Sequence, residues 1–281
     1  MTIPYGAFPA GLNIPVANEG FRPLEYAEAL GEAYLAFSKS NHRKKGGHYL
    51  TPASVARFMA GLSSYSEPRM RVLDPGSGTG ILSAAVCEAA CRSGTLKTLH
   101  VDAFETDSLL AGLCRLALSF SRDWLARHDI ALTFDVRHRD FVLEYAGALE
   151  ANSKVNRHSG NLDGTENEYS LVISNPPYFK IAKDDPRAAA WAALVHGQPN
   201  IYALFMAISA ELLSESGRLV YIVPRSFASG PYFRRFRDVF FRRVVPVAIH
   251  LFESRRDVFK NQTVLQENLV IAARTRAAGE V

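Results

Sequence analysis

Residues 71–93 read RVLDPGSGTGILSAAVCEAACRS, and this stretch decides the fold. A short apolar run ends at Asp74, a glycine-rich turn follows to residue 80, and a helical pattern continues to about residue 92. Glycines let the backbone turn sharply and approach a ligand, and the start of the next helix offers unpaired N–H groups. The stretch therefore predicts a strand, a turn and a helix with a ligand site at the carboxyl end of the strand. It lacks the GxxxxGK[ST] lysine, which disfavours nucleoside triphosphate hydrolysis.

The same alternation of short apolar runs and helical stretches continues along the chain. Further strands are expected to end near residues 105, 136, 174, 224, 252 and 273, with helices near 108–121, 201–214 and 232–242. Another helix is expected from Leu24 to about Phe37, and a further one with Thr51 as N-cap and Pro52 at its first position. The pattern predicts an α/β fold, a Rossmann-like, doubly wound, seven-stranded and mostly parallel sheet. Residues 182–200 are an irregular connection and a candidate lid.

Composition excludes several classes of protein. The 281 residues are 48% hydrophobic and 21% charged, which is ordinary for a globular chain and unlike a disordered or fibrous one. No apolar run is long enough to span a bilayer and no secretory leader is recognisable, so we expect a cytoplasmic protein without a membrane partner. Three cysteines do not make a disulfide scaffold, and neither they nor the histidines show metal-ligand spacing, so no metal site is predicted.

The last third of the chain is basic. Residues 225–260 hold nine basic and three acidic residues, although the whole chain carries a net charge of only +4. A one-sided basic region is typical of phosphate binding, but a solvated helix face fits the charge alone equally well. The candidate nucleic-acid contacts are Arg225, Arg234, Arg235, Arg237, Arg255, Arg256 and Lys260.

The most specific motif is Asn175-Pro176-Pro177-Tyr178, which follows the apolar run LVIS. The prolines stiffen the backbone and leave carbonyls that have no neighbouring N–H. The Asn175 carboxamide and the Pro176 carbonyl are two acceptors for one amino group, and Tyr178 offers a flat face to a planar substrate. The motif ends a strand at the same sheet edge as the glycine turn, so a substrate site is favoured over a plain proline turn.

Two acidic positions follow other strands. Glu105 comes about one strand–helix–strand step after the glycine turn, where an acid can hold the hydroxyls of a ribose. An acid that caps a helix is the alternative, although Asp107 suits that role better. Asp140 precedes Phe141, and the pair could bind and pack against an adenine, while a simple turn residue fits Asp140 equally well.

Together, DPGSGTG, Glu105, Asp140-Phe141 and NPPY resemble the motif series of S-adenosylmethionine-dependent methyltransferases that act on the amino nitrogen of adenine. HYLTP at residues 48–52 resembles the extra cofactor motif of that family, and the motif order is the gamma order of DNA adenine methyltransferases. The strings NPPYFKI, NIYALFM, VPRSFASGPYFRRFR, IHLFESRRDVF and VLQEN resemble restriction–modification methyltransferases of the PstI and BsuBI kind. The resemblance runs from about residue 40 to about residue 273.

The resemblance implies a class I methyltransferase sheet whose last strand is antiparallel, with an N-terminal arm and helix over residues 1–40 and a catalytic domain over residues 41–281. It implies S-adenosylmethionine as cofactor, double-stranded DNA with a flipped adenine as substrate, and a restriction endonuclease as a possible partner. The implied cofactor residues are Tyr49, Thr51, Pro52, Asp74, Gly76, Gly78, Gly80, Glu105, Asp140 and Phe141. The implied catalytic residues are Asn175, Pro176, Pro177, Tyr178 and Phe259, of which both aromatic rings would contact the target base.

The sequence is compatible with several functions. Members of the family usually continue past VLQEN into a domain that reads the DNA sequence, and we expect that domain to be absent from this chain. A protein glutamine methyltransferase, an RNA methyltransferase, a catalytically incomplete fragment and a non-enzymatic cofactor-binding subunit are alternatives. HYLTP and the basic last third favour nucleic acid, so the sequence predicts the DNA adenine-N6 methyltransferase of a restriction–modification system.

Overall fold

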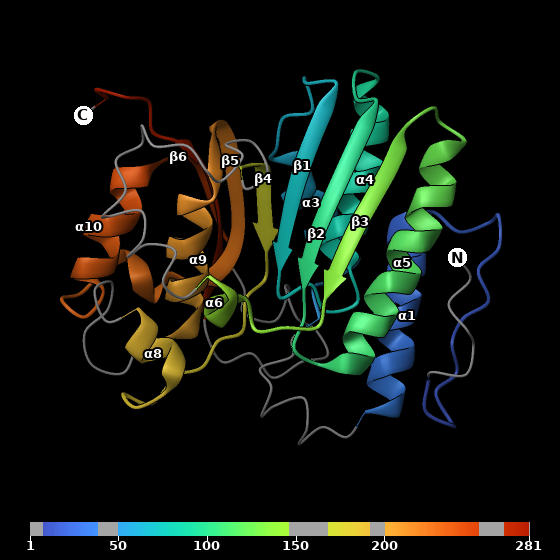
Figure 1. The fold of residues 1–281 in the computed structure, drawn as a ribbon, viewed down its shortest axis with the longest axis horizontal. Coiled ribbons are helices and arrows are strands. Elements are labelled where there is room, and N and C mark those ends of the chain that lie inside the picture. Colours follow the sequence, from blue (N-terminus) through green and yellow to red (C-terminus); the bar gives the residue numbers. More distant parts are fainter. Residues whose placement is uncertain (1–7, 39–49, 146–167, 192–199, 253–266, 281) are drawn as a thin grey trace.

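The computed structural model describes residues 8–38, 50–145, 168–191, 200–252 and 267–280, which form a seven-stranded sheet (Figure 1). The strand order is β3-β2-β1-β4-β5-β7-β6, and β7 is antiparallel to both of its neighbours while β1 to β5 pair in parallel. This confirms the predicted doubly wound α/β fold with an antiparallel last strand. The strands are β1 Arg69–Pro75, β2 Thr98–Phe104, β3 Ala131–Arg137, β4 Tyr169–Ser174, β5 Leu213–Pro224, β6 Val244–Leu251 and β7 Asn268–Thr275.

Successive residues of a strand point to opposite faces of the sheet, and here both faces carry apolar side chains. Helices therefore cover both faces. Val72 packs into the core beneath one group of helices, and its neighbour Leu73 packs into the core beneath the other. The first group is α1 Pro23–Phe37, α3 Ala53–Gly61, α4 Ile81–Ser93 and α5 Ser108–Ala126. The second group, gathered beside β4 and β5 in Figure 1, is α6 Phe141–Glu144, α8 Pro186–Ala190, α9 Ile201–Glu211, the 3-10 helix η2 Arg225–Ala228 and α10 Arg234–Arg243.

The strand order creates a switch point between β1 and β4, where the chain leaves the centre of the sheet in two opposite directions. From β1 the chain proceeds outward to β2 and β3, then returns to β4 on the other side of β1 and continues to β5. In open α/β sheets a ligand binds at the carboxyl ends of the strands at such a switch point. The end of β1 carries the glycine turn and the end of β4 carries the NPPY motif, so the fold brings the two predicted motifs together.

Several predicted element boundaries were wrong, among them the end of α5, which continues to Ala126 and not only to residue 121. Helix α3 begins at Ala53 with Pro52 as N-cap, because Pro52 has an extended backbone (ψ 146°) and the Thr51 hydroxyl bonds to Asn175 instead of capping the helix. Helix α9 ends at Glu211, and β5 begins at Leu213, inside the region predicted to be helical. The early part of β5 passes close to β4 at Gly217, where a Cβ would lie 2.8 Å from the Tyr169 carbonyl oxygen.

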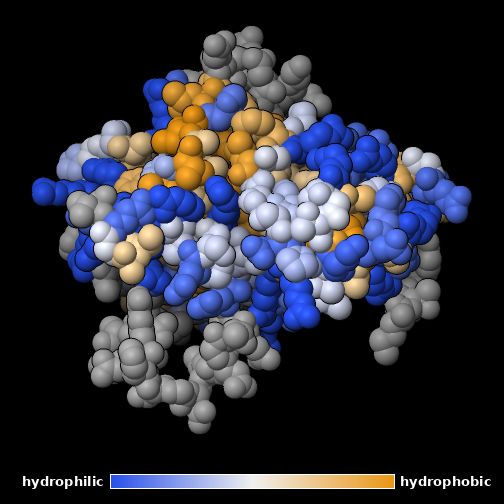
Figure 2. Space-filling view, turned by 90° about the horizontal axis from the view of Figure 1, so that it is seen from above, coloured by the Kyte–Doolittle hydropathy of each residue, from blue (hydrophilic) through white to orange (hydrophobic). Residues whose placement is uncertain are grey.

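The outer strand β6 carries exposed apolar side chains, with Ile249 55% and Leu251 61% exposed. The side of the molecule seen in Figure 2 is largely hydrophilic, with one larger apolar area and smaller apolar spots. Pro246 lies in this edge strand, and the pairing register with β7 shifts between Pro246 and Ala248. A proline and a bulge both interrupt the row of backbone donors and acceptors that another strand would need, so β6 is a poor edge for further pairing.

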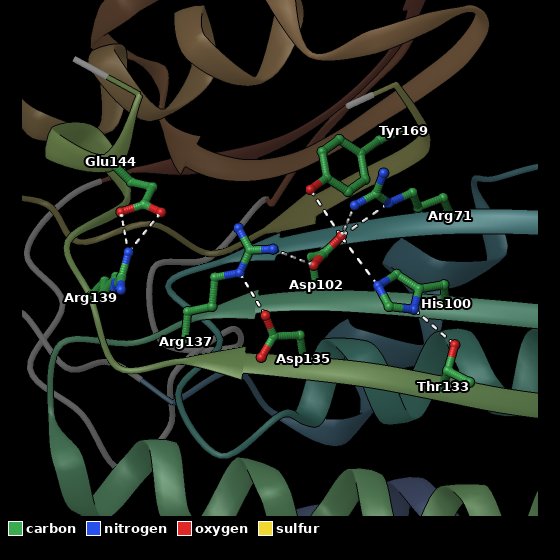
Figure 3. A network of polar contacts seen from close by, with 9 residues as sticks. All are labelled: Arg71, His100, Asp102, Thr133, Asp135, Arg137, Arg139, Glu144 and Tyr169. Carbon is green, nitrogen blue, oxygen red and sulfur yellow. Dashed lines mark hydrogen bonds and ion pairs between the residues drawn. The ribbon is translucent and has the colours of Figure 1, made fainter. Parts of the chain in front are cut away.

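A polar network that the sequence did not reveal joins the first four strands on the face opposite α4 and α5 (Figure 3). Its centre is Asp102, whose side chain is 1% exposed. Arg71 donates to Asp102 Oδ2 from Nη2 at 2.8 Å, Tyr169 donates to the same oxygen at 3.0 Å, and Arg137 donates to Oδ1 at 3.2 Å. Burial opposes ionisation, but the bonds from His100 and Arg71 outweigh it and lower the pKa of Asp102 to about 2.

We predict that Asp102→Asn costs about 2 kcal/mol of unfolding free energy at pH 7, because the folded state lowers the pKa from 3.8 to about 2. A lowered acid pKa stabilises the fold above pH 4, and this contribution is lost as the pH falls from 4 towards 2. Urea unfolding at several pH values should therefore show the gap between wild type and variant closing in acid. Asp135→Asn is the matched control, since Asp135 also bonds Arg137 but is 55% exposed. A gap that does not change with pH would contradict this role.

Candidate active site

A cavity of about 190 Å³ lies at the carboxyl ends of β1, β2 and β4. Its wall includes Gly76 and Gly78 after β1, Glu105 after β2, and Asn175 and Pro177 after β4. Asp140 and Phe141, which follow β3, also line it. The structure thus places residues from all four predicted strand-end motifs around one cavity.

The glycine turn is tied to the end of β2. The amides of Gly76 and Ser77 donate to the Phe104 carbonyl at 2.9 and 2.8 Å, and the amide of Gly78 donates to Glu105 Oε2 at 2.9 Å. Gly76 and Gly78 have positive φ angles of 78° and 56°, which residues other than glycine rarely adopt. A Cβ on Gly76 would lie 3.4 Å from the Phe205 ring, so the absence of a side chain keeps this part of the cavity open.

Glu105 is 6% exposed, and each of its carboxylate oxygens accepts a backbone bond. Oε2 accepts from Gly78, and Oε1 accepts from the amide of Asp107 at 2.9 Å. Asp107 caps α5 by accepting from the amides of Leu109 and Leu110, which confirms that Asp107 and not Glu105 is the helix cap. Glu105 is therefore held rigidly, with its carboxylate at the cavity wall.

Asp74 and Gly80, which the resemblance assigns to the cofactor, are not among the residues that line this cavity. Asp74 is fully buried and accepts a bond from the Ser83 hydroxyl at 2.6 Å. Burial raises the pKa of Asp74 to about 7. The bond from Ser83 opposes this rise, and the negative charge of Glu105 adds to it. Gly80 is the N-cap of α4, and a Cβ there would lie 3.0 Å from Cys114 Sγ, so this glycine serves the packing of α4 against α5.

Asp140 is a helix cap that also lines the cavity. It caps α6, because Oδ1 accepts from the amides of Val142 and Leu143 at 2.9 and 3.1 Å, and it also lines the cavity. Phe141 is 2% exposed, and its ring packs against Phe104 with 5.4 Å between centroids. The pair gives the cavity an acidic and an aromatic wall at the end of β3.

The NPPY motif is anchored at both ends of its asparagine. Asn175 Nδ2 donates to the Thr51 hydroxyl at 3.0 Å, and the Tyr178 hydroxyl lies 2.5 Å from Asn175 Oδ1 and 2.8 Å from the Ile222 carbonyl oxygen. Burial raises the pKa of Tyr178 well above its usual value, so the phenol stays protonated. Pro176 is buried, and neither it nor Tyr178 lies among the residues that line the cavity. Tyr49 and Phe259, both predicted site residues, lie outside the described residues.

The sequence did not single out Arg187, which also lines the cavity from α8. Its guanidinium forms two bonds with Asp185 at 2.8 and 2.6 Å, lies 3.5 Å from Asp140 Oδ2, and sits over the Phe179 ring at 5.7 Å. Trp191 donates from its indole to the Val142 carbonyl at 3.1 Å, which fastens this segment to α6. The described part of the candidate lid, up to residue 191, is therefore held against the cavity, and only its position just after NPPY could have suggested this.

The basic residues of the last third differ in their surroundings. Arg237 donates to the carbonyls of Phe227, Ser229 and Gly230 at 2.8–3.1 Å, and Arg225 is ion-paired with Glu267, so both have structural partners. Arg234 and Arg235 are exposed on α10. The predicted contacts Arg255, Arg256 and Lys260 lie outside the described residues.

Two features are absent from the described residues. No group of three or more His, Cys, Asp or Glu side chains there is arranged to hold a metal ion. No helix in that part of the chain has both the length and the apolar character needed to cross a membrane.

Residues 117–259 match the model of the Eco57I restriction-modification methylase family. The chain is 33% identical over 227 residues to type II methyltransferase M.BsuBI of Bacillus subtilis, covering 80% of this chain and 42% of that protein. It is 29% identical over 251 residues to type II methyltransferase M.PstI of Providencia stuartii, covering 86% and 46%. The chain thus spans less than half the length of these relatives. A Listeria monocytogenes protein assigned to the class I S-adenosylmethionine-dependent methyltransferases has the same fold, with a TM-score of 0.68 and 16% identity over 94% of this chain and 71% of that one.

We predict that Asp74→Asn changes the pH dependence of stability in the direction opposite to Asp102→Asn. The folded state raises the pKa of Asp74 from 3.8 to about 7, so the wild type loses stability as the pH rises from 4 to 7. Relative to wild type, the variant should gain roughly 2–4 kcal/mol over that pH range in urea unfolding. Asp123→Asn, at a side chain that is 74% exposed, is the control and should give no such trend. A flat difference between pH 4 and 8 would show that Asp74 is ionised in the fold throughout.

Proposed function

The chain belongs to the Eco57I restriction-modification methylase family, and on this premise we propose that it transfers a methyl group from S-adenosylmethionine to the N6 amino group of adenine in double-stranded DNA. This activity would make it the modification component of a restriction–modification system. The observation that carries the proposal is the position of Asn175, at the wall of the cavity that also holds the glycine turn and Glu105. The type II methyltransferase names of the two relatives support it.

The residues around the cavity fit the proposed cofactor. Gly76 and Gly78 leave room that a Cβ would fill, and Glu105 presents a fixed carboxylate that can accept bonds from two ribose hydroxyls. Asp140 and the Phe141 ring offer an acceptor for an amino group and an apolar wall for an adenine. When bound, S-adenosylmethionine supplies a methyl group activated on a positively charged sulfur.

The proposed catalytic step depends on hydrogen-bond acceptors. The amino nitrogen of adenine shares its lone pair with the ring and is a poor nucleophile. The Asn175 Oδ1 and the Pro176 carbonyl oxygen would each accept an N–H of that amino group, which draws the lone pair out of conjugation and towards the methyl group. Acceptors that are fixed in place before the reaction stabilise the developing charge without a cost of reorganisation.

The substrate must bring its base to this site. An adenine inside a duplex is out of reach, so flipping would cost a few kcal/mol, which base stacking on an aromatic ring partly returns. Tyr178 lies beside Asn175, with its ring edge-on to Tyr202 at 6.3 Å. The exposed Arg234 and Arg235 at the start of α10 would contact phosphates outside the cavity.

We predict that Asn175→Ala lowers methyl transfer by about 10²–10³-fold, because one of the two acceptors for the amino group is lost. Cofactor affinity, measured by calorimetry, should change little. The assay follows labelled methyl from S-adenosylmethionine into DNA, RNA and protein in parallel. Asn18→Ala, at an exposed asparagine of the N-terminal segment, is the control. Label that enters only RNA or protein, or a variant that keeps most of its turnover, would overturn the proposed reaction.

We predict that two arginines of α10 differ in their effects. Arg234→Ala should reduce the slope of log affinity for DNA against log salt by about one and leave stability unchanged, since the side chain is exposed. Arg237→Ala should instead lower the unfolding free energy by about 1–3 kcal/mol, because three carbonyls lose a charged donor. Fluorescence anisotropy at several salt concentrations and urea unfolding measure the two effects. An unchanged salt slope in Arg234→Ala would remove Arg234 from the DNA interface.

A further inference from the structure

The carboxamide of Asn175 is held by a residue that lies 124 positions earlier in the chain. Asn175 Nδ2 donates to Thr51 Oγ1 at 3.0 Å, and the side chain of Thr51 comes from the segment that enters α3. Thr51 is 5% exposed and is not among the residues that line the cavity. The hydroxyl is therefore buried and bonded to the asparagine of the NPPY motif.

The other end of the same carboxamide is held by Tyr178. Its hydroxyl lies 2.5 Å from Asn175 Oδ1 and 2.8 Å from the Ile222 carbonyl oxygen, and a phenol has one proton to donate to these two acceptors. A carbonyl oxygen has two lone pairs, so Oδ1 can accept from Tyr178 and still accept an N–H of a substrate. With Thr51 at one end and Tyr178 at the other, the carboxamide plane is fixed before a substrate arrives.

The segment around Thr51 is itself fixed against the glycine turn. A Cβ on Gly78 would lie 3.6 Å from the Leu50 side chain, and the amide of Ala53 donates to Glu28 of α1 at 3.3 Å. Threonine is branched at Cβ and has few side-chain rotamers, so its hydroxyl loses little freedom when it binds Asn175. Residues 50–53 thus connect the position of the glycine turn to the position of the NPPY motif.

We infer that Thr51 is a positioning residue for Asn175 and acts on methyl transfer through the carboxamide, whereas the sequence resemblance assigns it to the cofactor. This inference rests on the proposed function, because it gives the fixed carboxamide a target amino group to accept from. A carboxamide that loses its Nδ2 anchor can rotate away from the amino group, and a misplacement of about 1 Å can cost about a hundredfold in rate.

The test compares Thr51→Val, which keeps the shape and removes the hydroxyl, with Thr51→Ser, which keeps the hydroxyl. Thr51→Val should lower kcat by about tenfold to a hundredfold, with KM and the Kd for S-adenosylmethionine nearly unchanged. Thr51→Ser should restore most of the rate. Thr275→Val is the control, because Thr275 donates to the Ser214 carbonyl at 2.6 Å at the opposite edge of the sheet. Thermal unfolding of all variants shows that each is folded at the assay temperature.

A second readout needs no activity. The side-chain NH₂ signal of Asn175 in a ¹⁵N-labelled protein can be assigned by its loss in Asn175→Asp. In Thr51→Val this signal should shift and its protons should exchange faster with solvent, while Thr51→Ser should resemble wild type.

The outcomes separate the inference from the proposed function. An unchanged Asn175 signal together with a wild-type kcat in Thr51→Val would overturn the inference. A weaker Kd for the cofactor with an unchanged kcat would also overturn it and return Thr51 to the cofactor. A wild-type protein that transfers no methyl group to DNA adenine would overturn the proposed function, while the NMR signal would still decide whether Thr51 holds the carboxamide.

Discussion

The hydrogen bonds between the glycine turn and the end of β2 are the constraint on which the rest of the site depends. The Phe104 carbonyl accepts from two successive amides of the turn, and Glu105 accepts from Gly78. These bonds fix where β1 ends, where α4 begins and where the Glu105 carboxylate points. The turn needs positive φ angles at its glycines to make them, so sequence, backbone and cavity are linked at this point.

The NPPY motif reaches the same cavity because β4 lies next to β1 in the sheet. The order of the strands, and not the distance along the chain, decides which residues meet. Asn175 is separated from the glycine turn by about 100 residues, yet both line one cavity. The proposed division of work follows from this arrangement, with the β1 and β2 side holding a cofactor and the β4 side holding the group that reacts with it.

Much of this could be predicted from the sequence, for a physical reason. Glu105 and Asn175 directly follow their strands, and Asp140 comes shortly after the end of β3. The carboxyl ends of parallel strands meet at one edge, so finding the strands was enough to group these residues. Side chains whose partners come from distant segments could not be placed in this way. The sequence around Asp102 does not distinguish it from other strand residues, because its partners Arg71, Arg137 and Tyr169 come from other strands.

Predictions from neighbouring residues in the sequence were misleading where a side chain bonds to a distant part of the fold. Thr51 has the sequence context of an N-cap, but its hydroxyl bonds to Asn175 and the helix begins two residues later. Arg237 belongs to a basic stretch, but its guanidinium donates hydrogen bonds to backbone carbonyls in and just after η2. In both cases the side chain bonds to a part of the fold that the sequence alone does not place, so a rule based on the neighbouring residues could not name its partner.

The central claim, that the cavity and Asn175 serve methylation of adenine at N6, is tested most directly by identifying the product. Double-stranded DNA would be incubated with the protein and S-adenosylmethionine, digested to nucleosides and analysed by mass spectrometry against synthetic standards. We predict that N6-methyldeoxyadenosine is the product, and that Asn175→Ala forms it about 10²–10³-fold more slowly. Methylation of cytosine, or no methylated nucleoside from a protein that binds the cofactor, would contradict it.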